Sequence, residues 1–221
     1  MRRLFQALSA GTARVLIAST ALAATAALSA PIELKLVGKD GNAIGGTVVM
    51  LRSADASRPL AKPVDAVMIQ KNMEFSPHVL VVPTGSKVTF PNNDTVQHQV
   101  YSNSQAKRLD IGLYKGTPKP EVFDLAGVVT LGCNIHDNML GYIYVVDAQY
   151  YGRMDASGSW KGDVQPGTYT VQIWHPRSSG PKPVIDQQIK VSAGEPSIVL
   201  RVLTPLRLRP DSQVPANWDA Y

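Results

Sequence analysis

The sequence predicts an all-β fold, because short strand-like runs recur through the chain and no segment has the spacing of an amphipathic helix. The runs are rich in Val, Ile, Thr and Tyr, and Gly, Pro, Asn and Asp separate them. Many short strands at this spacing are typical of one or two β-sandwiches. The clearest runs are residues 32–37, 47–51, 79–82, 142–146, 169–174 and 198–203.

Residues 1–30 predict a secretory signal peptide. Arg2 and Arg3 give a positive start, residues 15–28 are almost wholly apolar, and small residues up to Ala30 offer cleavage sites. A membrane anchor is the alternative, but the apolar run is shorter than the roughly 20 residues that a spanning helix needs. We therefore expect a periplasmic mature chain that begins near Pro31 and has no membrane span.

The charge of the mature chain excludes one class of partner. Residues 1–30 carry three arginines and no acid, so their removal lowers the formal net charge from +5 to +2. The sequence has no basic patch with interleaved aromatic residues, so nucleic acid is not an expected partner. The remaining length allows one large or two small domains.

The chain has one cysteine, Cys133, and therefore no internal disulfide. In an oxidising compartment a free thiol is exposed to oxidation unless it is buried or bound to a metal. Residues 132–141 read GCNIHDNMLG, which places a thiol at Cys133, an imidazole at His136 and a thioether at Met139. Strand-like runs flank this segment, so a short loop can turn the three side chains toward one point.

These side chains favour copper. Thiolate and thioether are soft ligands, and two histidines, one cysteine and a weak axial methionine form the trigonal site of copper electron-transfer proteins. The loop supplies three of those four ligands and lacks one histidine. The chain has four histidines in all, and His98 follows a strand-like run and a polar turn within residues 88–100, VTFPNNDTVQHQV.

This order of motifs resembles the cupredoxin family over about residues 64–147. The carriers of the resemblance are an Asn-x-Asp turn before His-x-Val, then Cys-x-x-His and Met-x-Gly with the short ligand loop of amicyanin-type members. The resemblance implies a Greek-key β-sandwich that holds one copper ion. Its ligands would be His98, Cys133, His136 and Met139.

Three further polar residues, Gln99, His78 and His175, are not expected to bind the copper ion. Many cupredoxins have asparagine after the first histidine ligand to tie the ligand loops together, whereas this chain has Gln99, and Asn92 or Asn93 is the expected substitute. His78 lies at the start of a strand-like run, and His175 closes another. We expect both to pack or cap rather than to bind metal.

The segments on either side of the cupredoxin-like part carry a second resemblance. Residues 35–52 predict a hairpin with a Gly-rich turn, and residues 154–171 hold a matching second half. Together they resemble a carboxypeptidase regulatory-like domain, a small transthyretin- or Ig-like β-sandwich. We expect a nested arrangement, in which residues 32–56 pair with 150–203 around a cupredoxin domain at 60–147. Residues 204–221 would form an extended tail.

The leading functional hypothesis is a one-electron carrier. The resemblance implies that His136 presents its ring edge to a redox partner, within an apolar patch of Pro77, Ile135, Leu140 and Tyr142. The partner would be a dehydrogenase or a cytochrome, and the amicyanin-like loop points to amine oxidation, as in methylamine utilization. Copper tolerance or delivery, with a copper-handling partner, is the alternative from a second class. A metal-free adhesion sandwich is the third.

Enzymatic activity is not expected. A multicopper oxidase needs a further histidine-rich cluster, which four histidines cannot supply, and a binuclear copper centre needs two cysteines. A cysteine hydrolase would pair Cys133 with a histidine distant in sequence, whereas His136 is three residues away.

Overall fold

The computed structural model describes residues 29–178, 181–192 and 197–201, and these residues are all-β, as predicted. Among the described residues, no helix could span a membrane. The predicted signal peptide and C-terminal tail lie outside the described residues. The strands are β1 Ala30–Val37, β2 Val48–Ser53, β3 Asp65–Val67, β4 Ile69–Lys71, β5 Glu74–Ser76, β6 Val79–Pro83, β7 Ser86–Thr89, β8 His98–Ser104, β9 Lys107–Tyr114, β10 Glu121–Phe123, β11 Gly127–Gly132, β12 Leu140–Val146, β13 Tyr150–Arg153, β14 Ser159–Val164, β15 Gly167–Trp174, β16 Ile185–Val191 and β17 Ser197–Arg201.

Strands β3 to β12 form one β-sandwich. Its larger sheet has the order β6-β12-β11-β8-β9, its smaller sheet has the order β10-β7-β3, and β4 and β5 form a separate hairpin. The apolar core of this sandwich takes side chains from both sheets and from the hairpin, among them Phe75, Phe90, Phe123, Leu131 and Ile143.

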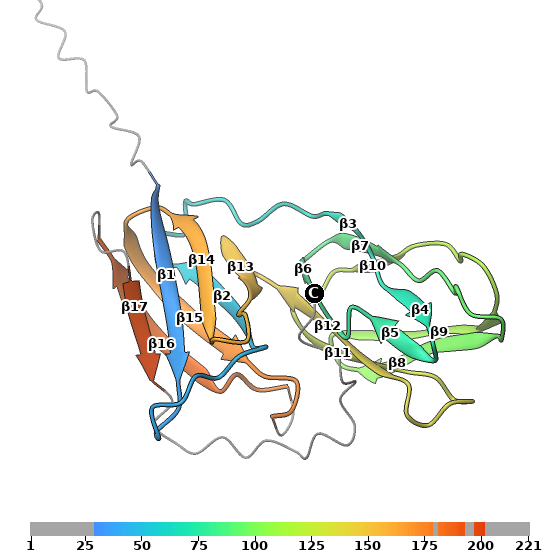
Figure 1. Cartoon of the computed structure of the whole chain (residues 1–221). Helices are drawn as coiled ribbons and strands as arrows, with labels where there is room; N and C mark the ends of the chain where they lie inside the picture. The colour runs from blue at the N-terminus through green and yellow to red at the C-terminus, as the bar shows by residue number, and fades with distance from the viewer. Residues whose placement is uncertain (1–28, 179–180, 193–196, 202–221) are drawn as a thin grey trace, which may run out of the picture.

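A second sandwich combines strands from both ends of the described chain, and Figure 1 shows its blue and orange strands side by side. One sheet has the order β14-β1-β17 and the other β13-β2-β15-β16. Leu34 and Leu36 of β1 and Val49 and Leu51 of β2 are buried in one core with Val171 of β15. The strands before residue 60 therefore pair with strands after residue 149, which is the pairing that a nested arrangement requires; the domain boundaries stay a prediction.

The hairpin predicted over residues 35–52 is wrong as a strand pairing. β1 and β2 lie in different sheets, and only a bridge between Val37 and Ala43 closes a tight turn around Gly41, whose φ is +82°. After that turn the chain crosses to the other sheet. The crossing lets β1 and β2 bury their apolar side chains in the same core from opposite sides, which a hairpin within one sheet would not allow.

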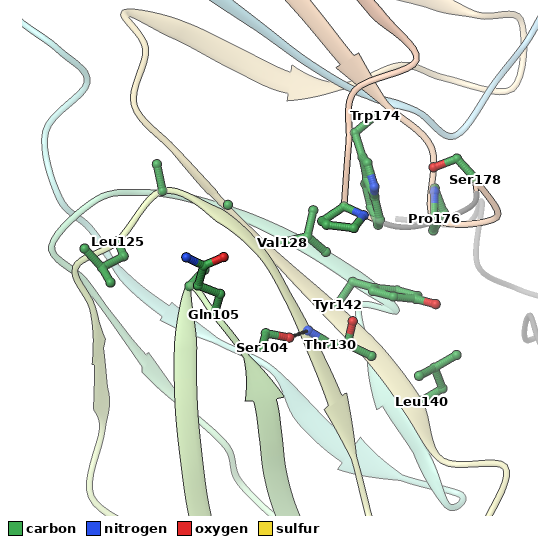
Figure 2. Close-up of a pocket in the computed structure, with 14 residues that line it drawn as sticks. Ser104, Gln105, Leu125, Val128, Thr130, Leu140, Tyr142, Trp174, Pro176 and Ser178 are labelled. Atoms are coloured by element: carbon green, nitrogen blue, oxygen red, sulfur yellow. Dashed lines mark hydrogen bonds between the residues drawn. The ribbon is translucent and has the colours of Figure 1, made fainter.

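The two sandwiches meet along β12. Ile143 and Val145 enter the core of the first sandwich, whereas Tyr142 and Tyr144 pack against Trp174 of β15. Both faces of the strand are thus buried, which explains its continuous apolar run without alternation. A groove of about 680 Å³ opens beside this junction, and Figure 2 shows Trp174 and Pro176 on one side of it with Val128 and Tyr142 on the other.

Candidate metal centre

His98 is the first residue of β8, and the polar turn before it fixes its position. The Asn92 side chain donates hydrogen bonds to the carbonyls of Val96 (3.0 Å) and Tyr114 (2.9 Å), and its oxygen accepts the Asp94 amide at 3.0 Å. The His98 side chain is completely buried. The turn therefore delivers an imidazole into the end of the sandwich rather than to its surface.

Cys133, His136 and Met139 lie in the loop that joins β11 to β12. The loop is a compact turn in which the Met139 amide donates to the His136 carbonyl at 2.9 Å. Cys133 is 4% exposed and Met139 is 2% exposed, and both belong to the core of the first sandwich. His136 is half-buried, so of the three it alone reaches toward solvent.

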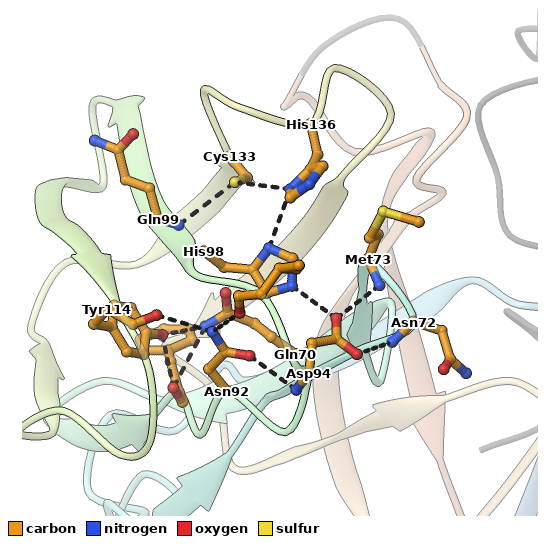
Figure 3. Close-up of polar contacts among 12 residues, drawn as sticks. Gln70, Asn72, Met73, Asn92, Asp94, His98, Gln99, Tyr114, Cys133 and His136 are labelled. Carbon is orange, nitrogen blue, oxygen red and sulfur yellow. Dashed lines mark hydrogen bonds and ion pairs between the residues drawn. The ribbon is translucent and has the colours of Figure 1, made fainter.

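The loop and the start of β8 bring three ligand atoms together (Figure 3). His98 Nδ1 lies 3.1 Å from His136 Nδ1, and His136 Nδ1 lies 3.7 Å from Cys133 Sγ. One ligand atom from each of the three residues lies within 4.8 Å of the other two. The antiparallel neighbours β8 and β11 cause this convergence, because Gly132, just before the cysteine, pairs with Tyr101 of β8.

Hydrogen bonds around the sulfur come from the residue that follows His98. The Gln99 amide donates to Cys133 Sγ at 3.4 Å, and Gln99 Oε1 accepts a hydrogen bond from Asn134 Nδ2 at 2.8 Å. Gln99 itself thus ties the two ligand segments together. The expected substitution by Asn92 is wrong, because the Asn92 side chain bonds Val96, Tyr114 and Asp94 instead of the ligand loop.

Asp94, the last residue of the Asn-x-Asp motif, has a contact with His98 that the sequence did not predict. Its Oδ2 lies 2.7 Å from His98 Nε2, on the side of the ring away from His136. Burial alone would raise the pKa of Asp94, but hydrogen bonds from the Met73 amide, His98 and the Asn72 amide lower it overall. The sequence shows that Asp94 lies four residues before His98. The spacing alone does not predict the contact, because the turn must first bring Asp94 to the His98 ring.

The other two histidines lie outside this cluster. His78 is 3% exposed and packs edge-on against the Tyr142 ring, with ring centroids 5.4 Å apart. His175 is 2% exposed, and its Nδ1 accepts the Arg177 amide at 3.0 Å. Both have the packing and capping roles that were expected of them.

The predicted apolar patch needs correction at one residue. Ile135 is 51% exposed beside His136, but Tyr142 is only 8% exposed, because it packs against Trp174 of the second sandwich. Exposed apolar side chains that the sequence reading missed are Met73, next to the partner of His98, and Val96, in the turn before it. Their exposure depends on which sandwich covers which face, and no local sequence signal carries that information.

The three converging residues fit a soft or borderline metal ion. With Asp94 Oδ2 within hydrogen-bond distance of Nε2, a His98 ring that donates there would turn its Nδ1 lone pair toward His136. Two facing Nδ1 lone pairs at 3.1 Å repel each other unless one nitrogen is protonated or both bind a cation. Met139 lies buried in the same apolar cluster as Cys133, and it is the one methionine in the loop sequence between β11 and β12.

Comparisons with known proteins cover parts of the chain. A family model described as polysaccharide lyase family 4, domain II, matches residues 125–197, and no curated protein sequence matches the chain. The chain is similar to the solved structure of a purple cupredoxin from Nitrosopumilus maritimus, at 26% identity over 37% of this chain and 100% of that chain, with a TM-score of 0.33.

Two other solved structures are similar over less than half of this chain. A copper-containing nitrite reductase from Thermus scotoductus is 20% identical over 43% of this chain and 25% of that chain, with a TM-score of 0.36. A reduced Cu(I) form of an amicyanin mutant is 20% identical over 44% of this chain and 98% of that chain, with a TM-score of 0.34. The resemblance of the flanking strands to a carboxypeptidase regulatory-like domain stays a prediction.

Proposed function

We propose that the chain binds one copper ion through His98, Cys133 and His136, with Met139 as a weak axial ligand, and carries single electrons between redox partners. The observation that supports this most strongly is the convergence of one sulfur and two imidazole nitrogens within 4.8 Å. Those donors are the ones that copper prefers in electron-transfer sites. The copper ion would supply the one-electron chemistry, and the protein would supply a fixed set of ligands.

Rigidity of the ligand set favours electron transfer. His98 and Cys133 are buried in a β-sandwich, and Gln99 links the segments that carry them. Buried side chains in a packed core change position little, because close packing leaves no room for movement. A ligand set that cannot rearrange keeps the same geometry in both copper oxidation states, so each electron arrives and leaves with little reorganisation.

The half-buried His136 gives a route between the centre and a partner. Its neighbour Ile135 is 51% exposed, and Met73 and Val96, on the segments that hold His98, are 53% and 45% exposed. We propose that these side chains form an apolar contact surface for a redox protein such as a dehydrogenase or cytochrome. Small apolar contacts of this kind suit the weak, transient complexes of electron carriers.

Copper tolerance or delivery is the second candidate, and the exposed Met73 favours it. A thioether at the surface beside a copper site can bind Cu(I) briefly while the ion passes to another protein. In either role we propose a periplasmic, non-enzymatic protein, in which the second sandwich supports the first along β12.

Two rates separate these candidates. The copper-loaded chain is cycled between ferricyanide and ascorbate, and its Cu(I) form is then mixed with a large excess of a Cu(I)-specific chelator. A carrier recovers its full visible absorption over many cycles and loses Cu(I) far more slowly than it exchanges electrons. Loss of Cu(I) to the chelator within the time of one redox cycle would contradict the carrier role and favour delivery. Met73→Leu is the matched variant, because it removes the exposed thioether but leaves the proposed ligands intact.

A further inference from the structure

A carboxylate lies directly behind the imidazole of His98. Asp94 Oδ2 and His98 Nε2 are 2.7 Å apart, the imidazole is completely buried, and the Asp94 side chain is 14% exposed. A hydrogen bond this short, to an ionised acceptor, is about twice as strong as one between neutral groups. The contact is therefore strong enough to set the orientation of the ring.

Asp94 is itself held from two directions. Its amide donates to Asn92 Oδ1 at 3.0 Å, within the turn that leads to β8. On the other side, Oδ1 accepts the Asn72 amide at 2.7 Å and Oδ2 accepts the Met73 amide at 2.9 Å. The carboxylate thus links the His98 ring to the hairpin turn between β4 and β5.

That turn has positive φ at both of its central residues. Asn72 and Met73 have φ values of +57° and +59°, which suit a two-residue hairpin turn and which asparagine adopts readily, whereas methionine seldom does. The positive φ of Met73 costs free energy, and the hydrogen bonds to Asp94 offset that cost. The strained turn in return presents two amide donors to one carboxylate. Asp94 is therefore fixed as an acceptor pointing at Nε2.

We propose that Asp94 is a positioning residue for the metal centre, which holds His98 in the Nε2–H form with Nδ1 facing the metal and stabilises Cu(II) relative to Cu(I). This inference rests on the proposed function. A carboxylate behind a histidine ligand fixes the tautomer and raises the basicity of the ligating nitrogen. Its negative charge also favours the more positive ion in a site shielded from water.

The first test compares Asp94→Asn with Asp137→Asn. Asn keeps the shape of the side chain but removes its charge, and Asp137 is an exposed carboxylate of the ligand loop, so its variant controls for charge alone. Competition with chelators gives the Cu(II) and Cu(I) affinities. We expect Asp94→Asn to lower the ratio of Cu(II) to Cu(I) affinity by about tenfold and Asp137→Asn to change it by less than about threefold. Equal ratios in the two variants would overturn the proposal.

The second test needs no copper. Long-range ¹H–¹⁵N NMR of the metal-free chain reports which nitrogen of His98 carries the proton. The parent chain is expected to show His98 as the Nε2–H tautomer and Asp94→Leu a mixture of both. An unchanged tautomer in Asp94→Leu would refute the positioning role. This readout also separates the two proposals, because a parent chain that binds no copper would sink the proposed function and leave the tautomer test intact.

The Asp94 variants could lose the fold because the turn at Asn72 and Met73 is no longer held, and a variant of that turn serves as the control. Replacing both Asn72 and Met73 by Gly removes the strain, because glycine adopts positive φ at no steric cost. The Asp94 substitutions are then repeated in that background and checked by near-ultraviolet circular dichroism. The shift in affinity ratio and the change of tautomer are expected to persist there. Their disappearance in the relaxed turn would mean that Asp94 acts only on the turn, and would contradict the proposal.

Discussion

At the scale of single residues, the proposed metal ligands of the candidate centre differ in how far each side chain is buried. Cys133 and Met139 are in the core, His98 is completely buried, and His136 is half-buried. Sequence spacing predicted that the loop donors could converge, and the sulfur and the loop imidazole do. The hydrogen bond that Asp94 accepts from His98 could not be predicted, because it depends on a turn that folds Asp94 back on its own segment. The contact of Gln99 with Asn134 could not be predicted either, because it joins two segments that are distant in sequence.

Met139→Leu tests the axial thioether without disturbing the packing. The two side chains have similar volumes, so we expect the free energy of unfolding to change by less than about 1.5 kcal/mol. Removal of the sulfur takes away a weak donor that stabilises Cu(II), so the reduction potential should rise while the thiolate-to-copper absorption stays. Voltammetry and a visible spectrum measure both. An unchanged potential would show that Met139 is a core residue and not a ligand.

His78 predicts a dependence of stability on pH. Burial, with a smaller contribution from the Arg153 cation, lowers the pKa of His78 to about 4, from 6.5 in an exposed histidine. Between these values the unfolded chain binds the proton and the folded chain does not, so this contribution to stability is present above pH 6.5 and is lost as the pH falls toward 4. A shift of this size corresponds to about 3 kcal/mol.

The matched variant for this test is His78→Phe, which keeps an aromatic ring against Tyr142. The difference in unfolding free energy between the parent and the variant, both metal-free, cancels the titration of His98 and His136. We expect that difference to move by about 3 kcal/mol in favour of the variant between pH 7 and pH 4, as measured by urea unfolding. A difference that is constant over this range would contradict a buried neutral His78.

At the scale of elements, β8, β11 and β12 place the metal ligands. The sequence predicted a strand over residues 142–146 after the ligand loop, and β12 has the same end but begins earlier, at Leu140, while β11 ends at Gly132. The separation of β1 and β2 into different sheets was not predictable from the Gly-rich turn. That choice depends on β14 and β17, which lie more than a hundred residues further along the chain.

Gly141→Ala tests how tightly β12 is held against the β4–β5 hairpin. A Cβ at Gly141 would lie 2.8 Å from the Cβ of Phe75, which is 2% exposed and cannot move aside easily. We expect a loss of about 1–3 kcal/mol in stability and a changed copper spectrum, because β12 begins where the ligand loop ends. Thr130→Ala, an exposed change on neighbouring β11, is the control. Equal stability of the two variants would contradict tight packing at this position.

At the scale of the whole molecule, the second sandwich covers one face of the first. The cluster that joins them takes Val48 and Trp174 from the second sandwich and Val79, Val128 and Tyr144 from the first. The all-β class and many strand positions followed from residue types and turn signals. The junction did not, because the run of residues 142–146 reads as a buried strand whichever element covers it.

Trp174→Ala tests the junction separately from the metal centre. Trp174 is 2% exposed and packs against Tyr142 and Tyr144, so its removal should cost about 3–5 kcal/mol. The ring partners of Trp174 are Tyr142 and Tyr144, and neither is a proposed copper ligand. The copper absorption of the folded variant should therefore match that of the parent. Calorimetry and a visible spectrum give the two results, with Leu113→Ala as an exposed control. Loss of the copper spectrum in a folded variant would show that the sandwiches are coupled at the centre.

The measurement that tests the central claim most directly is a titration of the purified chain with Cu(II), followed by visible absorption and electron paramagnetic resonance, beside the variant Cys133→Ser. We predict one copper per chain and an intense thiolate-to-copper band in the parent chain that reductant bleaches reversibly. In the variant the band should be absent. A parent chain that stays colourless with no stoichiometric copper, or a variant with the same band, would contradict the copper centre formed by His98, Cys133 and His136.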